Sequence, residues 1–261
     1  MRNLRGVYIM WYRDILRFWG DRALMGTTLA MPVLYLVIFG TGIASIFPKQ
    51  GGFDYIAFMY PGIISMVVIM GSVISGATVV FDREFGFLKE VLVAPISRTS
   101  VVVGKALGGA SIAVLQGVLM LVFIPFAHVN ISVAEGFILV GLMLLLAVSL
   151  TSMGLLLGSR IKSMQAFQAA MNLLMFPIMF LSPVMFPVEQ LPGWLATLVK
   201  INPVSYGVDA VRQAVMGVQE SAPFGIYLFD YRMSIGLDVA MMAFFGLIML
   251  TLAIQSFRVY E

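Results

Sequence analysis

Six long stretches of the chain contain no Asp, Glu, Lys or Arg and are apolar on every face. A helix crosses the hydrocarbon core of a bilayer, about 30 Å thick, with about 20 apolar residues. A charge at mid-membrane costs about 2.5 to 3.5 kcal/mol, whereas barrel strands are shorter and alternate in polarity. We therefore predict an all-α integral membrane protein in which one domain, residues 23–258, forms six transmembrane helices, over about 24–47, 56–81, 101–127, 134–158, 164–186 and 235–257.

Residues 1–22, before the first span, predict an amphipathic helix that lies at the membrane interface. Trp11 and Trp19 suit the headgroup region, and the arginines of the opposite face can reach lipid phosphates. Two interpretations stay open, a simple interfacial anchor and a docking element for a partner.

A second amphipathic helix is predicted over residues 82–95, between spans two and three. Phe85, Leu88 and Leu92 follow helical spacing, charged residues cover much of the remaining surface, and Pro95 ends the run. Such a helix can lie on lipid or sit in a groove on another protein.

Two short helices are predicted over residues 188–217, between spans five and six, and each is too short to cross a bilayer. Asn202 is a candidate N-cap and Pro203 occupies the first helical position after it. We expect a re-entrant hairpin at the outer side, in which Asp209 and Arg212 can pair and Asp238 either reaches outward or finds an arginine.

Small and polar residues within the spans have two interpretations, helix packing and contact with a transported molecule. Pairs of small residues four apart, at Gly104 and Gly108 and again at Gly154 and Gly158, favour packing. Asn172 at mid-span suits an interhelical hydrogen bond or a substrate contact. The candidate lining of a translocation path consists of Ser72, Ser75, Asn172 and Met175.

Composition agrees with a membrane protein, because 61% of residues are hydrophobic and only 11% are charged. Most Lys and Arg residues fall on one side of a six-span arrangement, so both termini are expected in the cytoplasm and the protein in the plasma (inner) membrane. The net charge of +3 then reflects topology and contact with anionic lipid, and it argues against a nucleic-acid partner.

Catalytic chemistry has little support in the sequence. Cysteine is absent, His128 is the single histidine, and neither a nucleophile elbow nor a phosphate-binding loop is found. We therefore predict no catalytic, cofactor-binding or metal-binding residues in this chain. A channel or an ion-coupled carrier remains an alternative, although such carriers usually keep charged residues at mid-membrane.

A set of residues spread in order over nearly the whole chain resembles the type-2 ABC exporter permeases, a group that includes daunorubicin-resistance-type drug exporters. The residues that carry this resemblance are Pro61, Gly62, Arg83, Glu84, Phe85, Gly86, Leu88, Glu90, Leu92, Pro95, Gly104, Lys105, Asn202, Pro203, Val204, Ser205, Tyr206, Asp209 and Arg212.

The resemblance implies a permease that forms a dimer, binds two copies of a soluble ATPase and moves an amphiphilic drug or lipid outward. The ATPase would use ATP and Mg²⁺, and a polysaccharide or lipid-linked glycan is the alternative cargo. Spans two and five would line the path. Residues 82–95 would form the coupling helix on the ATPase, with contacts from Arg83, Glu84, Gly86, Leu88, Glu90, Leu92 and Pro95. The outer gate would be formed by Asn202, Pro203, Tyr206, Asp209 and Arg212. Phe87-Leu88-Lys89 departs from the Thr-Leu-Glu of many members, which leaves the ATPase subtype open.

Overall fold

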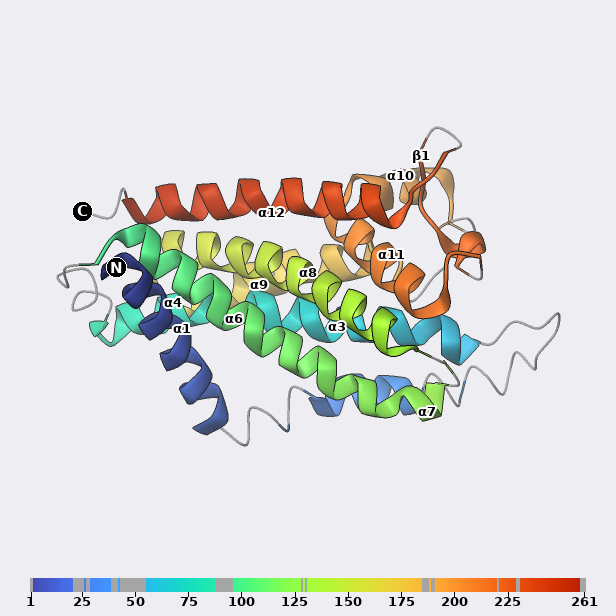
Figure 1. Cartoon of the computed structure of the whole chain (residues 1–261). Helices are drawn as coiled ribbons and strands as arrows, with labels where there is room; N and C mark the ends of the chain where they lie inside the picture. The colour runs from blue at the N-terminus through green and yellow to red at the C-terminus, as the bar shows by residue number, and fades with distance from the viewer. Residues whose placement is uncertain are drawn as a thin grey trace.

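The structure, a computed structural model, is a bundle of helices (Figure 1). It describes residues 2–20, 26, 29–38, 42, 55–87, 96–127, 129, 131–184, 188, 191–219, 221–228 and 231–258. Within these ranges the α-helices are α1 (Arg2–Gly20), α3 (Tyr55–Ile74), α4 (Ala77–Glu84), α6 (Arg98–Met120), α7 (Ile124–Ala127), α8 (Val133–Arg160), α9 (Met164–Phe180), α10 (Gly193–Ile201), α11 (Pro203–Met216) and α12 (Ile235–Arg258).

Further short elements connect these helices. A helical segment covers Leu29–Ile38, and 3-10 turns cover Leu121–Phe123 and Ala222–Phe224. The polar stretch before α12 contains a two-stranded antiparallel ladder of β1 (Tyr227–Leu228) and β2 (Tyr231–Arg232).

Four helical regions among the described residues are long and apolar enough to cross a membrane: Tyr55–Glu84, Arg98–Ala127, Val133–Arg160 and Ile235–Phe257. Two shorter apolar helices cover Leu29–Ile38 and Met164–Phe180. The prediction of an all-α, multi-pass membrane protein is confirmed at this level. The count of six spans and the re-entrant hairpin stay predictions.

The long helices lie side by side, and the bundle has two distinct ends (Figure 1). One, here called the α1 end, holds α1, the end of α4, the start of α6 and the C-terminal part of α12. The other, the hairpin end, holds α10, α11 and the β-ladder. The start of α1 and the end of α12 lie at the α1 end, and α12 packs mainly along α8.

Serine caps determine where three of these helices begin. The Ser97 hydroxyl accepts the backbone N–H of Ser100 at the start of α6, and Ser163 caps α9 in the same way. At the start of α8, Ser132 and Glu135 form a complete capping box. Each cap satisfies N–H groups that a helix cannot pair internally, so the local sequence alone specifies these boundaries.

Close helix packing explains two glycines of α8, Gly154 and Gly158. A Cβ atom at Gly154 would lie 2.6 Å from the carbonyl oxygen of Val73, and one at Gly158 would meet the backbone at Gly76. Gly76 lies at the break between α3 and α4, so the backbones of two helices touch there. The packing interpretation of this glycine pair is confirmed.

Two glycines of α6 allow α1 to pack closely against it in the same way. A Cβ atom at Gly104 would lie 2.6 Å from Cβ of Met10, and one at Gly108 would lie 3.0 Å from Cβ of Asp14. The Trp11 indole N–H adds a hydrogen bond to the Ser111 hydroxyl at 3.0 Å. The predicted amphipathic helix therefore packs along α6, whereas Leu4, Tyr8, Ile9, Leu16 and Trp19 are exposed.

Candidate functional site

Three consecutive residues at the end of α4, Asp82, Arg83 and Glu84, connect this helix to four others, and we call them the α4 junction. Asp82 forms the ion pairs of the α4 junction. One carboxylate oxygen accepts hydrogen bonds from Lys105 Nζ on α6 at 2.6 Å and from Arg13 Nη2 on α1 at 3.0 Å. The Lys105 side chain is only 1% exposed and that of Asp82 8%, so the pair lies away from solvent.

Arg13 contacts two carboxylates, because it also bonds Asp14 at 3.0 Å. Burial by itself lowers the pKa of the Arg13 guanidinium, but the neighbouring charges of Asp14 and Asp82 more than offset this, and the pKa is raised above its ordinary value. Lys105 makes a second, longer contact to the Thr78 hydroxyl at 3.3 Å. The cluster therefore joins α1, α4 and α6.

Arg83 joins α4 to the end of α8. Its two terminal nitrogens donate to the carbonyl oxygens of Ser159 at 2.7 Å and Ile161 at 2.6 Å. The last carbonyls of a helix lack internal partners and carry partial negative charge, which suits a guanidinium. The predicted coupling residue Arg83 is thus engaged within the chain.

Glu84 joins α4 to the start of α9. Its carboxylate accepts the backbone N–H of Met164, the first residue of α9, at 2.8 Å. A carboxylate at a helix N-terminus satisfies an unpaired donor and the helix dipole together.

The chain leaves α4 directly after this residue. Phe85 is 80% exposed, and Gly86 has a φ of 77°, a left-handed conformation that glycine adopts without strain. Residues 82–84, the start of the predicted coupling segment, thus belong to α4, and the chain turns at Phe85 and Gly86 before the rest of that segment. Four of its predicted coupling residues, Leu88, Glu90, Leu92 and Pro95, lie outside the described residues.

The predicted outer hairpin places α10 and α11 against the bundle at the hairpin end (Figure 1). Asn202 is the N-cap of α11, as predicted, because its side-chain oxygen accepts the Val204 N–H at 3.1 Å, and Pro203 occupies the first turn. The Asn202 amide also donates to the carbonyl oxygens of Ile178 and Leu181, near the end of α9. One side chain therefore starts α11 and holds it to α9.

Two further hairpin residues are almost fully buried. Tyr206 donates its hydroxyl to the carbonyl oxygen of Lys200 at 2.6 Å, which ties α11 to α10. Arg212 donates to the carbonyl oxygen of Pro183 and lies over the Phe58 ring, 4.5 Å from its centre. Arg212 thus connects α11 to α3 and to the turn after α9.

The expected ion pair between Asp209 and Arg212 is not formed among the described residues. Asp209 instead accepts from the Gln213 amide at 3.0 Å, and the same Nε2 donates to Asp238 on α12 at 2.9 Å. Gln213 bridges two fully buried carboxyl groups, while the guanidinium turns to a carbonyl and a ring. Asp238 is fully buried and so does not reach outward, and within the described ranges it forms no ion pair with an arginine.

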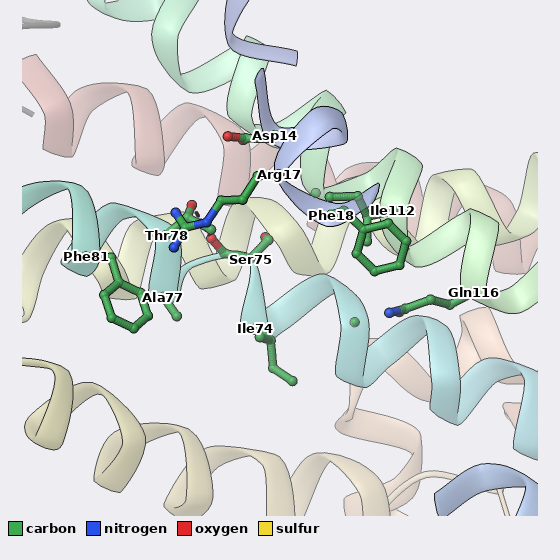
Figure 2. Close-up of a pocket in the computed structure, with 12 residues that line it drawn as sticks. Asp14, Arg17, Phe18, Ile74, Ser75, Ala77, Thr78, Phe81, Ile112 and Gln116 are labelled. Carbon is green, nitrogen blue, oxygen red and sulfur yellow. Dashed lines mark hydrogen bonds between the residues drawn. The ribbon is translucent and has the colours of Figure 1, made fainter. Parts of the chain in front are cut away.

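The four predicted path residues lie in different surroundings. Ser72 is fully buried and donates to the Val68 carbonyl oxygen of its own helix, and Met175 packs against the core. Asn172 is exposed on α9. Ser75 alone among the four lines a cavity that opens between α1, α4 and α6 (Figure 2). Their assignment to a path stays a prediction.

Sequence reasoning missed the ionic cluster and the Gln213 bridge. One signal was present, because Asp14, Lys105 and Asp238 lie inside or beside apolar helices, where an unpaired charge is costly. That signal shows that partners exist but does not identify them.

The contacts of the α4 junction link α4 to four other helices. Within the described ranges, no group of three or more His, Asp or Glu residues could hold a metal ion. Displacement of the end of α4 would act on α1, α6, α8 and α9 together, through the contacts of the α4 junction.

Comparison with known proteins agrees with this architecture. Residues 5–216 match the family described as ABC-2 type transporter. The chain is similar to the transport permease ycf38 of Cyanophora paradoxa, with 27% identity over 83% of this chain and 77% of that protein. The inner membrane transport permease YadH of Escherichia coli (strain K12) shares 29% identity over 81% of this chain and 83% of its own length.

A further relative bears on the class of transporter. The multidrug ABC transporter permease YbhR of Escherichia coli is 30% identical over 61% of this chain and 44% of its own length. The resemblance carried by the sequence motifs is thereby confirmed. The family match covers most of the chain and the structure is a multi-pass helical bundle, so this protein belongs to the ABC-2 type transporter family as a membrane-embedded permease.

Proposed function

We propose that this chain is the permease subunit of an ATP-driven exporter that moves an amphiphilic drug or lipid outward. ATP hydrolysis would come from a separate soluble ATPase, two copies of which would bind a permease dimer. The observation that carries the proposal is the α4 junction, where the first three residues of the predicted coupling segment are tied to four helices.

The mechanism is mechanical. Residues 82–95 would seat in a groove of the ATPase, and closure of the ATPase pair on ATP would push this segment. Asp82, Arg83 and Glu84 would pass the displacement to α1, α6, α8 and α9, because each contact is a short, charge-assisted hydrogen bond. Movement of α9 relative to α3 would then open the path.

The outer face of α9 supports a dimer. Gln168 and Asn172 lie four residues apart on this apolar helix and are exposed. Amides facing lipid would leave their hydrogen-bonding groups unsatisfied, which costs free energy. A second copy of the chain, or a polar path between two copies, would satisfy them.

The orientation follows from charge. Lys and Arg gather on the side that holds both termini, and the start of α1 and the end of α12 lie together at the α1 end. We therefore place the α1 end in the cytoplasm and the hairpin end outside, in the plasma (inner) membrane. A drug or lipid cargo agrees with the multidrug designation of YbhR, and a glycan is the alternative cargo.

The test is reconstitution. The tagged chain is purified from membranes of its host, and co-purifying proteins are identified and checked for a Gly-x-x-x-x-Gly-Lys-Ser or Gly-Lys-Thr phosphate loop. The complex is then placed in proteoliposomes with fluorescent drugs, labelled lipids and lipid-linked glycans. We expect ATP-dependent outward movement of an amphiphile and an ATPase rate that rises with it.

A pair of variants isolates the coupling step. Leu88→Asp puts a charge on the apolar stripe of the predicted coupling helix and should abolish ATPase binding. Val133→Asp adds the same charge at the exposed first residue of α8, at the hairpin end, and should leave assembly unchanged. Transport by the permease without any ATPase, or normal assembly of Leu88→Asp, would contradict the proposal.

A further inference from the structure

Two adjoining cavities form a groove beside α1. The larger, about 340 Å³, lies between α1, the break between α3 and α4, and α6 (Figure 2). The smaller, about 220 Å³, continues along α3 to the helical segment Leu29–Ile38. Gly71, Ile74 and Gln116 line both cavities, so we treat them as one feature, the α1 groove.

The groove is polar at one end and apolar at the other. Arg17, from α1, extends towards Ser75 and Thr78 at the polar end (Figure 2). The other end is lined mainly by apolar side chains, those of Met31, Val67, Met70 and Ile74, together with Gln116. This polarity matches an amphiphile whose head lies at α1 and whose tail runs along the apolar helices.

The charge at the polar end is positive. The Asp14 carboxylate, which also lines the groove, is bonded to Arg13 at 3.0 Å, so its charge is matched. Within the part of the chain that the structure describes, Arg17 forms no ion pair, and its guanidinium lies 5.6 Å from the centre of the Phe81 ring. A guanidinium presents a fork of donors that binds phosphate through two hydrogen bonds.

The groove opens sideways from the bundle. Ile74 is 50% exposed and Met31 is 61% exposed, although both belong to apolar helices. In a bilayer these side chains face the acyl chains of lipid, and the exposed Trp19 of α1 suits the adjoining headgroup layer. A lipid can therefore enter without leaving the membrane.

We propose that the α1 groove is a binding site for one anionic phospholipid. Arg17 binds the lipid phosphate, and one acyl chain lies along Ile74, Met70 and Met31. The site does not depend on the exporter assignment, since the lipid would bind whether or not it is transported. Failure of one proposal is therefore distinguishable from failure of the other.

The experiment uses the delipidated full chain in detergent and native mass spectrometry. Phosphatidylglycerol is titrated against diacylglycerol with the same acyl chains and against inorganic phosphate. We expect one phosphatidylglycerol per chain, bound about tenfold more tightly than diacylglycerol because of the charge-assisted hydrogen bonds, and no detectable binding of inorganic phosphate alone. Phosphate binding as tight as that of the lipid would overturn a lipid site.

Variants distinguish binding of the lipid phosphate from binding of the acyl chain. Arg17→Gln should weaken phosphatidylglycerol about tenfold and leave diacylglycerol unchanged, whereas Arg5→Gln, the same change at an exposed position of α1, should alter neither. Ile74→Trp fills the apolar end and should weaken both lipids. Met70→Phe serves the same purpose if Ile74→Trp does not fold.

A photoreactive acyl chain locates the tail. Phosphatidylglycerol carrying a diazirine near the chain end should label peptides that contain Met31 or Met70, and Arg17→Gln should reduce that label. Equal effects of Arg17→Gln and Arg5→Gln, or labels confined to the exposed face of α12, would refute the site.

Discussion

Replacement of Asp82 by Asn removes one negative charge from between two cations while keeping the shape of the side chain. Lys105 has no other carboxylate within ion-pair distance among the described residues and is 1% exposed. Arg13, at 28% exposed, keeps Asp14. The loss therefore falls mainly on Lys105, which would remain as a buried charge without a counter-charge.

The size of the effect follows from burial. Removing one partner of a buried pair costs about 3 to 5 kcal/mol, because the remaining charge is not compensated. The lower part of that range applies here, since Asn can still accept a hydrogen bond from Lys105. A loss of about 3 kcal/mol is about a hundredfold in the folding equilibrium and about 6 to 12 °C in melting temperature for a chain of this size.

The assay is thermal unfolding of the purified protein in detergent, run as a double-mutant cycle. Adding Lys105→Met to Asp82→Asn removes the orphaned charge, so the double variant should be more stable than Asp82→Asn alone. In the assembled transporter, Asp82→Asn should also lower the coupling of ATP hydrolysis to transport.

The matched control is Glu135→Gln, the same carboxylate-to-amide change at an exposed capping box that glutamine can still complete. It should shift the melting temperature little. If Asp82→Asn shifted it no more than this control, or if Lys105→Met made Asp82→Asn worse, the reasoning about the cluster would be refuted.

Three further outcomes follow from other contacts. Gly154→Ala should destabilise the protein by about 1 to 3 kcal/mol, because its Cβ would lie 2.6 Å from the Val73 carbonyl oxygen. The control Gly141→Ala, on the same helix, meets nothing within 4 Å and should be neutral or stabilising in the same unfolding assay. Arg83→Lys keeps the charge but loses the forked guanidinium that binds two carbonyl oxygens, so it should lower the free energy of unfolding by about 1 to 3 kcal/mol. An unchanged ratio of ATP hydrolysed to substrate transported in this variant would argue against a coupling role. Asn202→Ala should cost more than the roughly 1 kcal/mol of a cap, and Asn202→Asp should restore only the cap, as limited proteolysis of the hairpin would reveal; protection of Asn202→Asp equal to that of the unchanged protein would contradict the tie to α9.

The sequence by itself determined the elements whose causes are local. Charge-free stretches predicted the apolar helices because the bilayer penalises every charge at once, whichever helices become neighbours. Asn202 and Pro203 predicted the start of α11 because a cap acts within a few residues. Paired small residues such as Gly154 and Gly158 predicted close packing, although not the helix that packs there.

The tertiary structure alone decided the partners. Asp82 meets Arg13 and Lys105, which lie 69 and 23 residues away, and Gln213 takes the place expected for Arg212 beside Asp209. Apolar surface is equally satisfied by lipid and by any neighbouring helix, so hydropathy does not select an arrangement. Buried charges and backbone contacts at glycine do select one, because each has few acceptable partners, and those partners become neighbours only in the folded bundle.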